Sequence, residues 1–76
     1  MSKDLSVGSK MVVTARKKTT WSQRRLAQSL GVSKARIGHI ESGETEPKIE
    51  VVQQCLSHLG FDFVSIYTEV QGVAHA

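Results

Sequence analysis

The sequence has too few cysteines and too short apolar runs for several common ways of stabilising or anchoring a small protein. Its 76 residues include one cysteine, which excludes an intramolecular disulfide and leaves a typical structural zinc site without two nearby cysteine ligands. No apolar run approaches the roughly 20 residues of a membrane span, and Lys3, Asp4 and Lys10 interrupt any signal-like stretch. We therefore expect one soluble domain without metal, cofactor or membrane, whose modest core is supplemented by oligomerisation.

Charge is distributed unevenly along the chain. Residues 1–40 contain nine lysines and arginines and one aspartate, a formal charge of +8, whereas residues 41–76 contain one lysine and six acidic residues, a formal charge of −5. The first half therefore suits a polyanion and the second half would repel one. The alternative is that an uneven surface charge has no functional meaning in a chain this short.

Capping residues and apolar spacing predict helices along most of the chain. Ser9 is the expected N-cap of a helix that runs to about Lys18. Ser22 is the expected N-cap of a second helix, and Gly31 is suited to end it because glycine adopts a left-handed conformation without steric cost.

Two further helices are predicted in the same way. Ser33 caps a third helix, which Gly43 ends, and a fourth runs from about Lys48 to Leu59 before Gly60. In the fourth helix apolar residues recur at the spacing of one helical face. That apolar face is made by Val52, Cys55, Leu56 and Leu59.

The segment from Phe61 to Val70 is rich in aromatic and β-branched residues, which favour a β-strand. Because the chain has no second strand to pair with it, we expect pairing with the same strand of a second copy about a two-fold axis. A fifth short helix or a packed extended tail is the alternative. The expected dimerisation residues are Phe61, Phe63, Val64, Ile66 and Tyr67.

The centre of the chain has the spacing of two helices that cross at a short glycine turn. Five apolar side chains around Gly31 can point inward together, and Ala27 is small where the helices cross closely. The outer face of the second of these helices then stays free to enter the major groove of DNA, which is about 12 Å wide. The five inward positions are Leu26, Leu30, Val32, Ile37 and Ile40.

Residues 21–43, WSQRRLAQSLGVSKARIGHIESG, resemble the lambda-repressor/Cro-like (XRE) helix-turn-helix family, and the resemblance extends over about residues 9–59. It implies a compact, mainly α fold of four or five helices that binds double-stranded operator DNA. We do not expect an enzyme, because the sequence shows no convergent set of titratable groups. It also implies a structural ion pair between Arg16 and Glu41, for which an Arg16–phosphate contact is the alternative.

A four-helix body followed by an apolar strand is similar to the HipB-type antitoxins. That similarity implies a homodimer in the bacterial cytoplasm, bound to the nucleoid through its operator, which represses its own operon and binds a HipA-like kinase toxin. A stand-alone phage or plasmid repressor, or a protein-interaction module without specific DNA binding, stays open. The expected organisation is an arm over 1–8, the helix-turn-helix domain over 9–60, a dimerisation strand over 61–70 and a tail over 71–76.

Side chains at the start of the third helix and one turn later are expected to face the groove. A cation there can donate to guanine O6 and N7, and an alanine can contact a thymine methyl. Gly38 either lets the backbone approach DNA closely or reads nothing. The expected base contacts are Gln23, Ser33, Lys34, Ala35, Arg36 and His39. The expected phosphate contacts, which position the protein without reading sequence, are Lys17, Thr19, Ser22, Arg24 and Thr45. For any one of these base or phosphate contacts, a solvated surface residue is the alternative.

Trp21 and Cys55 invite more specific roles but are expected to be structural. Trp21 could stack on a base, yet at the start of the second helix we expect it in the core. Cys55 lies on an apolar face, where a small buried hydrophobe is the simpler interpretation.

Overall fold

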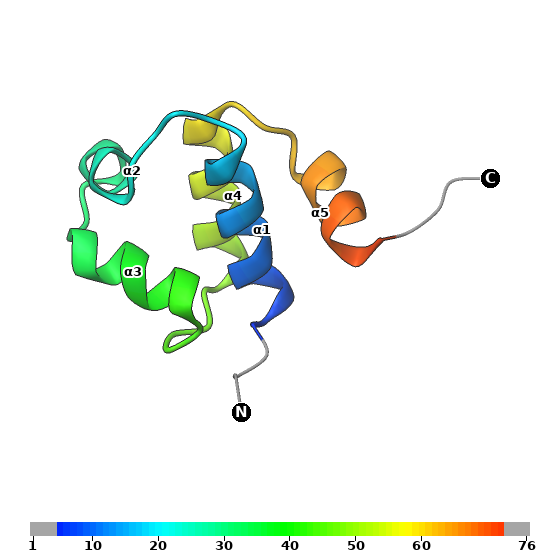
Figure 1. Cartoon of the computed structure of the whole chain (residues 1–76), viewed down its shortest axis with the longest axis horizontal. Coiled ribbons are helices and arrows are strands. Elements are labelled where there is room, and N and C mark those ends of the chain that lie inside the picture. The colour runs from blue at the N-terminus through cyan, green and yellow to red at the C-terminus, as the bar shows by residue number, and fades with distance from the viewer. Residues whose placement is uncertain (1–4, 73–76) are drawn as a thin grey trace.

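The computed structural model describes residues 5–72, which form five helices (Figure 1). The helices are α1 (Val7–Lys17), α2 (Gln23–Leu30), α3 (Lys34–Ser42), α4 (Ile49–Leu59) and α5 (Phe63–Gln71). Helices α1 and α4 lie side by side, with α2 and α3 packed on one side of them and α5 on the other (Figure 1). Residues 1–4 of the predicted arm and 73–76 of the predicted tail lie outside the described residues. Within residues 5–72, no helix is long and apolar enough to cross a membrane.

Helices α2 and α3 begin and end where the capping residues predict. The hydroxyls of Ser22 and Ser33 each accept a hydrogen bond from the backbone N–H three residues later. Gly31 and Gly43 end the two helices with φ of 74° and 89°, in the left-handed region that side chains rarely adopt. The ends of α2 and α3, and the short connection between them, are therefore set by serine caps and glycines that can be recognised in the sequence.

The start of α1 differs from the prediction. Ser6 is the N-cap, and its hydroxyl accepts from the backbone N–H of Ser9, so the helix begins at Val7. Ser9 is fully buried inside the first turn. The prediction of Ser9 as the cap is therefore wrong, because two serines three residues apart offer the same local signal and packing selects the earlier one.

The core lies where helices α1 to α4 meet. Leu26, Ile37 and Ile40 are at most 1% exposed, as predicted, whereas Leu30 and Val32 are half-buried at its edge. Burial raises the pKa of the Cys55 thiol to about 11, so this side chain is a protonated, small apolar core residue. The predicted apolar face of α4 is buried along its whole length, at Val52, Cys55, Leu56 and Leu59.

The segment predicted as a dimerisation strand is the helix α5, so that prediction is wrong; residues 5–72 contain no strand. Asp62 caps the helix by accepting from the backbone N–H of Ser65. Phe63, Ile66 and Val70, spaced as one helical face, pack on the core, with Ile66 2% exposed. Burial of this face outweighs the β-strand preference of the individual residues.

The five residues expected to build the strand interface are consequently divided between the two sides of a helix. Ile66 is buried within this chain and cannot contact a partner while α5 is docked. Phe61 and Phe63 are half-buried against the core. Val64 and Tyr67 face outward, 66% and 41% exposed.

Candidate nucleic-acid interface

Helix α3 is anchored on one side and open on the other. Ile37 and Ile40 fix it to the core, and Glu41 is half-buried beside them. The predicted base contacts of this segment all lie on exposed positions, namely Ser33, Lys34, Ala35, Arg36 and His39. Within the described residues, nothing covers the surface that would enter a groove.

The basic side chains of this surface come from both turns of α3. Lys34 and Arg36 are exposed in its first turn, and His39 follows one turn later. The Nε2 atom of His39 lies 3.3 Å from a carboxylate oxygen of Glu44, with both side chains largely in solvent. A contact this exposed restrains the imidazole weakly and leaves it free to turn toward a nucleic acid.

Four of the five predicted phosphate contacts are exposed side chains. Lys17, Arg24 and Thr45 are exposed, as is Ser22, whose hydroxyl caps α2. Thr19 is half-buried: its Oγ1 donates to the carbonyl of Arg16 and accepts from the backbone N–H of Trp21. The Thr19 hydroxyl thus stabilises the turn between α1 and α2.

A charged network joins α3 to the start of α2 and the end of α1. The Arg16 guanidinium donates to both carboxylate oxygens of Glu41, with Nε–Oε2 at 2.6 Å and Nη2–Oε1 at 2.9 Å. Arg16 also donates to the carbonyl of Trp21 at 3.1 Å. Gln23 Nε2 donates to Glu41 Oε1 at 3.0 Å. These bonds fix the inclination of α3, because three segments of the chain converge on one carboxylate.

The network also sets the protonation of its members. Burial alone would raise the pKa of the Glu41 carboxyl, but the hydrogen bonds from Arg16 and Gln23 outweigh it, so the pKa is lowered. The hydrogen bond to Glu41 raises the pKa of Arg16 against the opposing effect of burial. The pair is therefore fully ionised at neutral pH, and its bidentate geometry is specific to arginine.

Arg25 is a cation on α2 that sequence reasoning missed. Its guanidinium carbon lies 4.2 Å from the ring centroid of Trp21, a cation–π contact. Trp21 is half-buried against the core, rather than fully inside it, so one face of its ring is available to Arg25. The spacing of four residues between an aromatic and an arginine at a helix start is the signal that could have indicated the pair.

Residues 14–66 match the family model described as helix-turn-helix, which is more than half of the chain. The protein therefore belongs to the helix-turn-helix family of the Cro/C1 (XRE) type. Membership implies DNA binding in transcriptional regulation by a domain that is typically not an enzyme. No curated protein and no solved structure matches the chain significantly.

Proposed function

We propose that the protein is a transcriptional repressor that binds a palindromic operator as a dimer and reads the major groove with α3. The observation that carries this proposal is the combination of a helix-turn-helix match with an α3 face that is cationic, exposed and fixed from behind by Arg16 and Glu41. A rigid helix with a bare cationic face suits the floor of the major groove.

In this proposal the base contacts read the sequence and the phosphate contacts position the protein. Lys34 and Arg36 donate to guanine O6 and N7, Ala35 contacts a thymine methyl, and Gln23, Ser33 and His39 complete the base contacts. The sugar–phosphate backbone is held by Lys17, Ser22, Arg24, Thr45 and the α2 N-terminus. Thr19 is left out of this set, because its hydroxyl hydrogen is already donated to the Arg16 carbonyl. Two copies then place their α3 helices about 34 Å apart on one side of the duplex.

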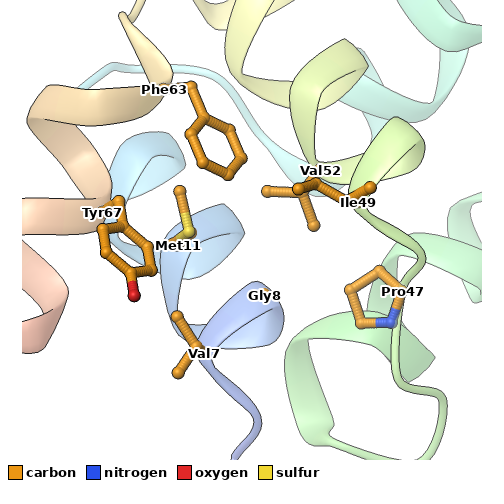
Figure 2. A pocket seen from close by; sticks show the side chains of 8 residues that line it. All are labelled: Val7, Gly8, Met11, Pro47, Ile49, Val52, Phe63 and Tyr67. Carbon is orange, nitrogen blue, oxygen red and sulfur yellow. The ribbon is translucent and has the colours of Figure 1, made fainter.

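We place the dimer contact on α5 and the groove beside it. The groove has a volume of about 180 Å³ and lies between α1, α4 and α5, with Phe63 and Tyr67 on one side and Pro47 and Ile49 on the other (Figure 2). The rings of Phe63 and Tyr67 are stacked, with centroids 6.2 Å apart. Ile49, Val64 and Tyr67 are the large hydrophobic side chains most exposed within residues 5–72. A second copy of this chain would remove them from water.

The dimer contact is tested by oligomeric state. Tyr67→Lys and Val64→Lys should shift sedimentation from dimer to monomer and weaken operator binding, whereas Gln54→Lys, exposed on α4 on the side opposite its buried face, should change neither. A wild-type protein that stays monomeric at micromolar concentration, on and off DNA, would contradict the dimer.

The antitoxin role loses its principal support. It rested on a strand after the fourth helix, and that segment is the helix α5. The family match does not distinguish HipB-type antitoxins from other members. We therefore favour a stand-alone repressor, and a kinase-like protein encoded beside this gene that co-purifies with it would restore the antitoxin role.

Selection of bound sites from a random DNA pool tests the repressor function directly. We expect a palindrome with half-sites about 10–10.5 base pairs apart, or a multiple of that distance, centre to centre. The affinity for that site should fall steeply with salt and exceed the affinity for random DNA by about a thousandfold or more. Enrichment of no sequence would instead favour a protein-interaction module that has lost specific DNA binding.

A further inference from the structure

The side of α3 that faces Gln23 contains a half-buried glycine that neither the backbone nor the packing of residues 5–72 requires. Gly38 lies in the helix interior, and its φ is not positive. A Cβ at this position would meet nothing closer than the side-chain oxygen of Gln23, at 3.9 Å, an ordinary contact distance. Glycine destabilises a helix interior relative to alanine, so Gly38 lowers the stability of α3 without allowing any closer packing within the described chain.

The Gln23 amide borders this space in a defined orientation. Its Nε2 donates to Glu41 Oε1 at 3.0 Å, and a carboxylate held by two hydrogen bonds from Arg16 can only accept. The amide is therefore not free to exchange its nitrogen and oxygen. Its oxygen is the atom nearest to the missing Cβ of Gly38, and among the described residues it receives no hydrogen bond.

We propose that Gly38 and Gln23 form a notch, between the Gly38 Cα and the Gln23 Oε1, that receives the exocyclic amino group of a base in the major groove. This inference rests on the proposed DNA-binding function. An unpaired amide oxygen needs a donor, and in the major groove the base donors are adenine N6 and cytosine N4. The absent side chain lets that base edge reach the helix backbone, where a methyl group would hold it away.

The two amino groups would be bound differently. With adenine, the Nε2 hydrogen of Gln23 that Glu41 leaves free can donate to N7, completing the two-bond pairing that glutamine makes with this base. With cytosine, the amino group alone is bound. Gly38 thus determines specificity because its missing side chain leaves room for the base edge. Glu41 acts as a positioning residue, because it orients the Gln23 amide that binds the base.

The first test adds a single methyl group. Gly38→Ala should raise the melting temperature, because alanine favours the helix, and yet weaken binding to the selected operator by about tenfold or more. Its binding to random DNA should stay unchanged. The matched control is Ser57→Ala, an exposed helical position on α4, which should leave operator affinity at the wild-type value. A Gly38→Ala protein that binds the operator as tightly as wild type would overturn the notch.

The second test removes the amino group from the DNA. Purine in place of adenine, or 2-pyrimidinone in place of cytosine, removes the amino group at each operator position in turn, together with the Watson–Crick hydrogen bond that it makes. Because the loss of that pairing acts on both proteins, we expect one position in each half-site at which the deletion weakens wild-type binding clearly more than it weakens Gly38→Ala, and the analogue that does so identifies the base. If every deletion acts equally on the two proteins, the notch is refuted while the repressor function stands; if wild type prefers no sequence, both fail.

Discussion

The outer faces of α3 and α5 are both open to solvent, yet their side chains suit different partners. α3 exposes Lys34, Arg36 and His39 and is held from behind by a partly buried ion pair. α5 exposes Val64 and Tyr67 and is held by Ile66, with a surface Lys18–Glu69 pair at 2.9 Å that adds little. Two helices with similar caps therefore present different surfaces to solvent, one basic and one apolar, because the outer side chains set the character of the surface and the inner ones set the docking.

The largest change in stability that we expect distinguishes the buried side of α5 from its exposed side. Ile66→Ala removes buried methyl groups and should lower the free energy of unfolding by about 2–5 kcal/mol. Val64→Ala, on the outer side, should change the monomer's stability by no more than about 0.5 kcal/mol. Urea unfolding at a concentration where the protein is monomeric measures both values, and equal losses would mean that α5 is not docked as described.

The next largest effect tests what holds α3. Arg16→Ala leaves the half-buried Glu41 carboxylate without its cation and should cost about 2–3 kcal/mol of stability. Arg16→Lys should recover only part of this loss, because an ammonium cannot reproduce the two parallel bonds. Thermal unfolding of both variants, with the exposed Arg24→Ala as control, checks the prediction. An Arg16→Ala protein as stable as the control would show that the pair does not hold α3.

Binding experiments sharpen the comparison on the α3 side. Lys34→Ala or Arg36→Ala should cost about 1–3 kcal/mol on the selected operator and relax the preferred base. Lys17→Ala should weaken binding to all sequences alike and reduce the salt slope by about 1. Titrations on operator and random DNA distinguish the two patterns, and the same loss on every DNA for all three variants would refute the assignment of base contacts.

The smallest effect is a dependence of stability on pH. The Glu41 pKa is lowered on folding from its ordinary value of 4.5, so its ionisation stabilises the fold above that pH, and the benefit is lost as the pH falls through the folded pKa. The difference in unfolding free energy between wild type and Glu41→Gln should therefore shrink below about pH 4.5. A difference that stays constant from neutral to acid pH would mean that Glu41 is not stabilised in its charged form.

Sequence alone predicted α2 and α3, whose ends are set by local signals. Ser22, Gly31, Ser33 and Gly43 define α2 and α3 because capping depends on a few neighbouring residues. The prediction for the C-terminal segment was wrong because the amino-acid composition favours a strand, whereas the spacing of its apolar residues favours a helix. Asp62 as a cap and the face made by Phe63, Ile66 and Val70 were the relevant signals.

For the candidate site, too, some features could be predicted from the sequence and others could not. Exposure of Lys34 and Arg36 follows from the periodicity that buries Ile37 and Ile40. The resemblance also supplied the pairing of Arg16 with Glu41, which the structure contains. The orientation of the Gln23 amide could not be predicted, because it depends on a side chain 18 residues away.

Mapping of backbone amide chemical shifts during titration with the selected operator tests the central claim most directly. If α3 enters the groove, the largest changes will fall on residues 22–24 and 33–42, while the outer face of α5 will change only with protein concentration. Changes centred on Val64 and Tyr67, with α3 unaffected by DNA, would contradict the account.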